Sequence, residues 1–245
     1  MLTVVMPAHN EADYLETAVR TVHDGLRARG HEVEVLVVEN GSTDDTRAIA
    51  RGLADELTGV SVTSQAAADY GAALREGLLA ARGETVVTFD VDYHDLGFVD
   101  RALALLRGGE GGPVIVVGSK RAPGAQDERP WSRRLVTAVF SWLLRAGFSL
   151  SVSDTHGMKA LRRRPVEAIV RGCRFRTDLF DTELVIRAER AGLRIAELPV
   201  RAQELRPSRT PIWRRLPRTL VGMLVLRWTL WREPDAGRRS GRHAT

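Results

Sequence analysis

The chain has 245 residues, of which 44% are hydrophobic and 27% are charged, with a net charge of +5 and a single cysteine, Cys173. This length is enough for one sizeable α/β domain and short for two, and the composition is that of a soluble globular protein. One cysteine excludes an internal disulfide and fits a reducing compartment, which favours a cytoplasmic protein. No segment has the roughly 18 uncharged apolar residues of a spanning helix, and the first residues read as a strand, not as a secretory signal.

The first 120 residues alternate between predicted strands and predicted helices. The apolar stretches that predict strands are residues 2–6, 33–38, 60–63, 85–89 and 114–117. The stretches with helical spacing are residues 15–30, 42–57, 71–82 and 98–106. Asn10 and Ser42 are the expected N-caps of the first two helices. Strands separated by helices of this length imply a mostly parallel sheet with right-handed crossovers, so the expected fold class is α/β.

The pattern changes after Gly118. Residues 121–130 form a polar segment with Pro and Gly and no periodicity, which is typical of a loop that is mobile or closes over a ligand. Further helices are predicted at residues 133–148, 164–171, 182–191 and 219–231, and one more strand at 193–198.

Most of the positive charge lies at the carboxyl end. Residues 206–245 hold ten Arg against two acidic residues, a net of +8, so residues 1–205 sum to −3. We therefore expect a domain at 1–205, a basic amphipathic segment at 206–232 that contacts an anionic membrane surface or phosphate groups, and a disordered tail at 233–245. A helix packed on the domain with solvated arginines is the alternative for the middle segment. No motif that reads nucleic acid accompanies the charge, so no nucleic-acid partner is expected.

Polar clusters follow four of the predicted strands. They are residues 7–11 (PAHNE), 39–42 (ENGS), 90–95 (DVDYHD) and 118–121 (GSKR). The carboxyl ends of parallel strands meet at one edge of a sheet, where open α/β sheets bind their ligands. The sequence therefore predicts a binding site at this edge.

Two carboxylates end the fourth predicted strand. Asp90 and Asp92 are two residues apart, so an extended chain carries both on one side. Like charges this close raise each other's pKa unless a cation relieves them, and hard divalent ions take such oxygen ligands. The alternative is that both are solvated loop carboxylates that cap the following helix.

Two other strings also permit a purely structural explanation. Residues 39–45 contain an Asn-Gly turn and a possible capping box that begins at Ser42, which needs no ligand. Residues 69–77 place small residues at the start of a helix, where the backbone can approach another group closely.

Together these strings resemble family 2 glycosyltransferases in their order and spacing. The residues that carry the resemblance are 7–11 (PAHNE), 39–46 (ENGSTDDT), 70–75 (YGAALR), 90–92 (DVD), 118–120 (GSK), 153–157 (SDTHG), 180–184 (FDTEL) and 196–200 (AELPV). The closest likeness is to dolichol-phosphate mannose synthases and bacterial polyprenyl-phosphate glycosyltransferases, over about residues 1–200. The resemblance implies a GT-A (Rossmann-like) fold with a mostly parallel central sheet, to which this chain would add a C-terminal amphipathic helix.

The resemblance also implies how a nucleotide diphosphate-sugar would be held. The donor-binding residues that it implies are Pro7, Ala8, Glu11, Glu39, Asp90, Val91 and Asp92. Asp92 would also ligate Mn²⁺ or Mg²⁺ with help from His94, whose imidazole favours Mn²⁺ somewhat. His94 as an ordinary loop residue is the alternative.

The acceptor side is implied by the later motifs. Asp181 and Glu183 match the acidic pair that lies near the acceptor in the family, although Asp181 would also make a good helix N-cap. The residues that would gather a lipid phosphate are Lys120, Arg133, Arg134, Arg206 and Arg209. Arginine suits such a role because its guanidinium binds phosphate in a bidentate manner.

Three departures from the family pattern affect these expectations. In the family the string at residues 39–46 usually begins with Asp, whereas this chain has Glu39-Asn40 there. This difference bears on recognition of the nucleoside base. The Arg that commonly follows Gly-Ser is Lys120, and residues 154–159 are one residue shorter than the common form.

The main prediction is an inverting, metal-dependent transfer of a sugar to a polyprenyl phosphate by a peripheral protein on the cytoplasmic face of the cell membrane. A phosphate acceptor is already anionic near pH 7, whereas a saccharide or other hydroxyl acceptor, the second hypothesis, would need Asp181 or Glu183 as general base. A catalytically silent protein that binds sugar nucleotides or docks on membranes is the third hypothesis. The presence of Asp90, Asp92, Asp181 and Glu183 disfavours it.

Overall fold

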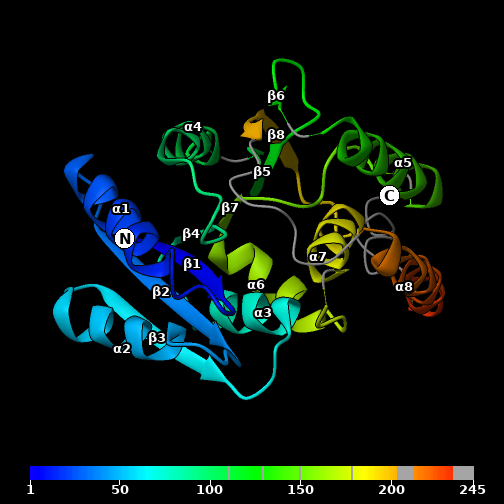
Figure 1. Cartoon of the computed structure of the whole chain (residues 1–245). Helices are drawn as coiled ribbons and strands as arrows, with labels where there is room; N and C mark the ends of the chain where they lie inside the picture. The colour runs from blue at the N-terminus through cyan, green and yellow to red at the C-terminus, as the bar shows by residue number, and fades with distance from the viewer. Residues whose placement is uncertain (110, 129, 149, 178, 203–211, 234–245) are drawn as a thin grey trace.

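The computed structural model describes the chain apart from residues 110, 129, 149, 178, 203–211 and 234–245. Seven strands form one sheet in the order β3-β2-β1-β4-β7-β5-β8 (Figure 1). These strands are β1 Leu2–Ala8, β2 Val33–Asn40, β3 Val60–Gln65, β4 Thr85–Thr88, β5 Ile115–Ser119, β7 Lys159–Arg162 and β8 Ile195–Pro199. The helices are α1 Leu15–Ala28, α2 Thr46–Glu56, α3 Tyr70–Ala80, α4 Leu96–Leu106, α5 Trp131–Phe148, α6 Arg163–Gly172, α7 Leu179–Arg190 and α8 Ile212–Arg232.

The sheet is mostly parallel, as expected, with one antiparallel strand. β1 pairs in parallel with β2 and β4, β2 with β3, and β5 with β8, whereas β7 runs antiparallel between β4 and β5. The sequence did not predict β7 because it has only four residues, and a Lys and an Arg flank its two apolar ones. Its first residue, Lys159, is nevertheless buried.

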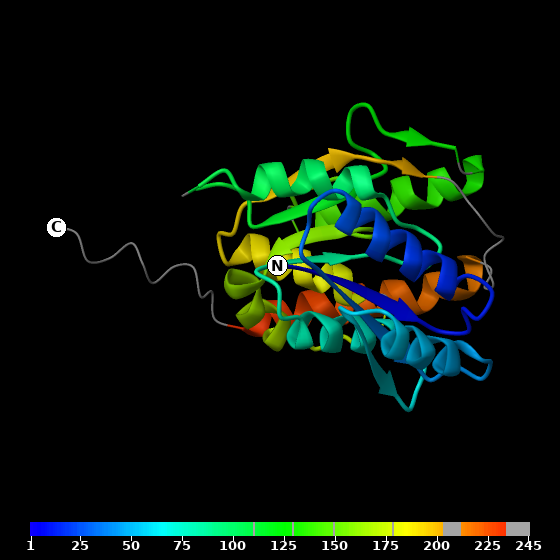
Figure 2. The ribbon, with the colours of Figure 1, turned by 90° about the vertical axis from the view of Figure 1, so that its left-hand side faces the viewer.

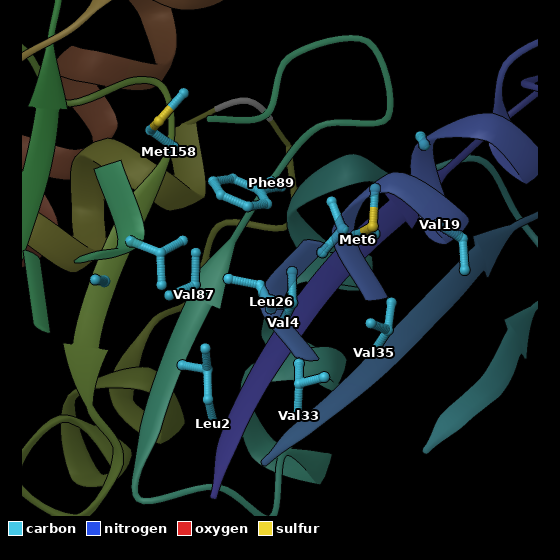
Figure 3. Packing of buried hydrophobic residues seen from close by; sticks show 14 of the residues in the cluster. Leu2, Val4, Met6, Val19, Leu26, Val33, Val35, Val87, Phe89 and Met158 are labelled. Atoms are coloured by element: carbon cyan, nitrogen blue, oxygen red, sulfur yellow. The ribbon is translucent and has the colours of Figure 1, made fainter. Parts of the chain in front are cut away.

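Helices cover both faces of the sheet, and the alternation of strand side chains divides the core between them. Val4 and Met6 of β1 pack with α1, α2 and α4 on one face, and Val5 packs with α3, α6 and α7 on the other. Figure 3 shows side chains of neighbouring strands, Val4 and Val35 among them, meeting α1 on the first face. Strands buried on both sides need continuous apolar runs, which is why the sequence predicted them well.

A third core cluster joins α5, α7 and α8 beside the sheet (Figures 1 and 2). Met223, Leu226 and Leu230 on one face of α8 are buried with Leu179 and Val185 of α7. The predicted C-terminal helix thus packs on the domain by one face, which agrees with the alternative given for it. In the part of the chain that the structure describes, no helix has the length and hydropathy needed to cross a membrane.

The segment 121–130, predicted as a loop that is mobile or closes over a ligand, contains a short strand that the sequence did not predict. Within it, β6 (Gln126–Asp127) pairs in parallel with β9 (Arg201–Ala202). The Gln126 backbone N–H donates to the carbonyl of Val200, and Ala122 is buried. Two-residue strands carry no periodicity that a sequence pattern could reveal.

Candidate active site

The charged residues expected at the carboxyl edge of the sheet meet around Asp90, just after β4. Burial of its carboxyl group, with nearby Asp92 and Asp181, raises the pKa of Asp90 to about 6. The Tyr70 hydroxyl, which donates to Asp90 Oδ1 at 2.9 Å, and the Lys120 ammonium both act in the opposite direction on this pKa. Side chains from four separate parts of the chain therefore lie within electrostatic reach of one carboxyl group.

A tight turn after β4 positions Asp92 and His94. The Tyr93 N–H donates to the Asp90 carbonyl at 3.1 Å, and Asp92 and His94 are both partly exposed. The cap of α4 is Asp95, whose carboxylate accepts from the Gly97 N–H at 2.8 Å. The alternative in which Asp90 and Asp92 cap that helix is therefore wrong.

The chemistry of Asp92 and His94 fits a divalent ion. The buried His94 Nδ1 has no hydrogen-bond partner among the described residues. Burial lowers the pKa of His94, against the opposing effects of the Val91 backbone and of Asp92 and Asp95, and thereby favours the neutral imidazole that binds metals. No group of three or more Asp, Glu, His or Cys side chains suited to a metal occurs in the described ranges, so a bound ion would take oxygen ligands from substrate as well.

Hydrogen bonds of Asn10 and Ser42 join the loops that follow β1 and β2. The sequence predicted both residues as helix N-caps. The Thr43 N–H donates to Asn10 Oδ1 at 2.8 Å, and the Asn10 N–H donates to the Ser42 hydroxyl at 3.1 Å. Asn10 adopts a left-handed backbone with φ of 55°, and α1 begins only at Leu15. The expected capping roles of Asn10 and Ser42 are wrong, because these polar groups link the loops instead.

Glu39 lies fully buried at the end of β2, and both its carboxylate oxygens have donors. Oε1 accepts from the Ser42 N–H at 2.6 Å and Oε2 from Arg47 Nε at 2.8 Å. Burial alone would raise the pKa of Glu39, but these hydrogen bonds hold it below its usual value. Pro7 and Ala8 are buried beside it, because Ala8 of β1 lies opposite Glu39 in the register of the two strands. Glu11 is also buried, and its N–H donates to the Thr46 hydroxyl at 2.7 Å.

A hydrogen-bond network that the sequence did not predict positions Lys120 at the end of β5. Glu197 of β8 accepts from the Ser153 N–H and hydroxyl at 2.9 and 2.6 Å, and Ser153 meets Ser119 at 2.9 Å. Asp154 accepts from the Lys120 N–H at 3.3 Å. The Lys120 ammonium lies 5.4 Å from the centre of the Tyr93 ring, so it extends towards the turn after β4.

The two carboxylates predicted on α7 have different surroundings. Asp181 lies in the first turn, inside the helix that begins at Leu179, so it is not the N-cap. Lys159 Nζ donates to Asp181 Oδ1 at 2.7 Å. Glu183 accepts from the Arg174 and Phe175 N–H groups, both at 2.8 Å, and from Arg187 Nε at 2.7 Å. Residues two apart on a helix do not face the same way, and Asp181 is the one that lies near Asp90.

The structure covers the proposed phosphate ligands only in part. Arg134 is exposed in the first turn of α5, where its N–H donates to the Pro130 carbonyl. The Arg133 side chain and the whole of Arg206 and Arg209 lie outside the described residues. Lys159, Asp154 and Glu197 were missed by the sequence analysis, although each lies in or beside a string that carried the family resemblance.

Comparisons with known proteins agree on one family. The family model described as glycosyl transferase family 2 matches residues 3–170. Glycosyltransferase AglD of Haloferax volcanii is 33% identical over 204 residues, which cover 81% of this chain and 32% of that protein. An uncharacterized glycosyltransferase of Mycobacterium tuberculosis is 34% identical over 200 residues, covering 81% of this chain and 84% of that protein. Polyprenol monophosphomannose synthase of Mycolicibacterium smegmatis is 29% identical over 206 residues, covering 80% of this chain and 75% of that protein.

Solved structures share the fold. Glucosyl-3-phosphoglycerate synthase of Mycobacterium tuberculosis, in complex with Mn²⁺, UDP and phosphoglyceric acid, superposes with a TM-score of 0.66 at 25% identity, over 97% of this chain and 80% of that one. The expected GT-A architecture is thereby confirmed.

Proposed function

The chain belongs to glycosyl transferase family 2, and from this premise we propose that it transfers a sugar from a nucleotide diphosphate-sugar to a polyprenyl phosphate. The observation that carries the proposal is the single cluster of Asp90, Asp92, Asp181 and Lys120 at the carboxyl edge of the sheet. Asp92, a carboxylate suited to a metal-bound diphosphate, and Lys120, a cation suited to a phosphate, both lie within electrostatic reach of Asp90. The relative from Mycolicibacterium smegmatis, which is named a polyprenol monophosphomannose synthase, supports the same acceptor class.

A divalent ion, Mn²⁺ or Mg²⁺, is the proposed cofactor. Asp92 and His94 would hold it together with the diphosphate of the donor, and the complex of the synthase with Mn²⁺ and UDP supports this choice. Bound there, the ion would neutralise charge on the departing nucleoside diphosphate. Tyr70 holds the Asp90 carboxyl group in place through its hydroxyl.

The nucleoside would lie against the linked loops after β1 and β2, beside Pro7, Ala8 and Glu11. Because both oxygens of Glu39 already have protein donors, this residue would act by shaping the loop at Ser42 and Arg47. The acceptor would attack the anomeric carbon from the face opposite the leaving diphosphate, with inversion. Of the two carboxylates on α7, we assign the acceptor side to Asp181, because it lies near Asp90.

Exposed apolar side chains on α5 and on α8 support a lipid acceptor. They recur at helical spacing on each helix and are Trp131, Leu135, Val139 and Trp142 on α5 and Leu220, Val221, Leu224, Val225, Trp228 and Trp231 on α8. Trp142 is 66% exposed and Trp231 79% exposed. Apolar side chains flanked by arginines suit the headgroup region of an anionic membrane, so we propose peripheral binding at the cytoplasmic face.

Replacing Trp142 and Trp231 by Ser is expected to weaken binding to anionic phospholipid vesicles by about tenfold or more, because each loses a large apolar side chain from the interface. Vesicle sedimentation at low and high salt measures the effect, and salt should weaken binding of the unaltered protein. Leu105→Ser on α4 is the matched control. Point variants are preferable to truncation, because removing α8 would uncover the buried cluster around Leu226. An unaltered protein that ignores anionic vesicles at low salt contradicts the membrane assignment.

The acceptor and donor classes can be tested together. Purified protein would be incubated with labelled UDP- and GDP-sugars, with and without Mn²⁺, and with farnesyl phosphate or farnesol as acceptor. We expect metal-dependent label on farnesyl phosphate and none on farnesol. Transfer to saccharide hydroxyls alone would contradict the polyprenyl phosphate acceptor and support a hydroxyl acceptor. Binding of the donor without any transfer would support a catalytically silent protein that binds sugar nucleotides.

A further inference from the structure

A buried ion pair lies on the acceptor side of the site. Lys159, the first residue of β7, and Asp181, in the first turn of α7, have side chains only 1% and 4% exposed. Lys159 Nζ donates to Asp181 Oδ1 at 2.7 Å and to the Gly157 carbonyl at 3.0 Å. Lys159 is also one of the largest fully buried side chains among the described residues.

Such a pair adds little net stability to a fold. Burying two charges costs solvation energy that their attraction repays only partly, and apolar residues of similar size often do as well. Lys159 is flanked by the apolar core on β7, where a Leu or Met would fit the pattern of the strand. The pair is therefore better explained by the site beside it than by stability alone.

Without Lys159, the acceptor side would hold three carboxylates, those of Asp90, Asp92 and Asp181, against the Lys120 ammonium. The positive charge of a bound metal would be balanced by the diphosphate of the donor. An anionic acceptor would then be repelled by the net negative charge of these side chains. With Lys159 in place, Asp181 contributes no net charge. One fewer unpaired carboxylate then opposes the Lys120 ammonium, so an anionic acceptor meets weaker repulsion.

We propose that Lys159 is a positioning residue that neutralises Asp181, so that the site accepts a phosphomonoester as nucleophile and Asp181 does not act as a base. This inference rests on the proposed function and states how its site would favour an anionic acceptor over a hydroxyl. It assigns a role to Lys159 and a charge partner to Asp181.

The chemistry balances without a base. An anionic phosphate oxygen forms a bond to the anomeric carbon while the bond from that carbon to the diphosphate oxygen breaks, and its electron pair leaves with the nucleoside diphosphate. No proton has to be removed, because a phosphomonoester is largely ionised near pH 7. A hydroxyl acceptor would instead pass its proton to Asp181, which would leave the Lys159 ammonium buried without its counter-charge.

A double-mutant cycle tests this role. Asp181→Asn and Lys159→Gln each leave one buried charge unpaired, so each is expected to lower kcat/KM for farnesyl phosphate at least tenfold. The double variant removes both charges and is expected to recover at least tenfold relative to either single variant. Its kcat/KM should keep the pH profile of the unaltered enzyme, because the ionisation of the acceptor phosphate governs the acidic side. A folded double variant that is as inactive as Asp181→Asn overturns the proposal and indicates a base.

Acceptor binding gives a second measurement that does not require turnover. In the presence of UDP and Mn²⁺, Lys159→Met should bind farnesyl phosphate at least tenfold more weakly than the unaltered protein, with farnesol binding unchanged. Equal loss for both ligands indicates a purely structural role and overturns the inference. If the unaltered protein transfers sugar to farnesyl phosphate but the substitutions at Lys159 and Asp181 lack the expected effects, only the role of Lys159 is refuted. Transfer to hydroxyls alone refutes the proposed acceptor as well.

Discussion

Asp92→Asn is expected to lower kcat for sugar transfer by roughly a hundredfold to a thousandfold, the loss typical when a group that stabilises developing charge is removed. Asp92 is partly exposed in the turn after β4, so an amide of the same size leaves no buried gap. It does remove the negative charge that would hold a divalent ion beside the diphosphate. Circular dichroism should show an unchanged fold, while titration of Mn²⁺ in the presence of UDP should show weakened binding.

The matched control is Asp95→Asn, three residues further along the chain. Asp95 caps α4, and Asn serves almost equally well as an N-cap, so both stability and turnover should remain close to normal. Full activity of Asp92→Asn in the presence of EDTA would contradict the metal assignment. A loss of similar size in both variants would point to the turn itself and not to the metal.

Glu183→Ala is expected to lower the free energy of unfolding by about 3–5 kcal/mol, because it breaks a buried charged network. Glu183 is fully buried, and its carboxylate accepts from two backbone N–H groups, those of Arg174 and Phe175, and from Arg187. The substitution removes the acceptor of those N–H groups, and among the described residues Glu233 is the carboxylate that remains to pair with Arg187. Urea unfolding of the variant measures the loss.

Glu189→Ala, on the same helix, is the control for that measurement. Glu189 accepts from the Ser151 N–H and hydroxyl at an exposed position, so its loss should cost about 1 kcal/mol or less. If Glu183→Ala is as stable as the control but inactive, Glu183 contacts substrate and the assignment of the acceptor side to Asp181 alone is wrong.

The strands and the position of the site were predictable because the information for both is local. A run such as that of β2 is apolar at successive positions because both faces are covered, and it remains recognisable without knowledge of its neighbours. The polar strings after β1, β2, β4 and β5 had to meet once the strands were parallel, and the structure places Asp92 and Lys120 within electrostatic reach of Asp90.

The local roles of polar residues were predicted less well, because one side chain can satisfy a nearby helix end or a distant loop. Asn10 and Ser42 have the residue types and spacing of N-caps, yet they bind each other across more than thirty residues of sequence. Asp95 caps α4, whereas the sequence offered Asp90 and Asp92 for that role as the alternative to a metal site. A sequence pattern cannot choose between such partners because the competing hydrogen bonds are similar in strength.

The sequence by itself determined the fold class, the family and the edge of the sheet at which the chemistry lies, since periodicity and the order of the motifs are properties of the chain. Only the tertiary structure decided how the carboxylates on α7 are used. It pairs Asp181 with Lys159 of β7, a strand that no periodicity revealed, and it surrounds Glu183 with donors from residues 174, 175 and 187. The charge that a buried carboxylate presents depends on the partner that folding brings within about 3 Å of it, and that partner can lie at any distance along the chain.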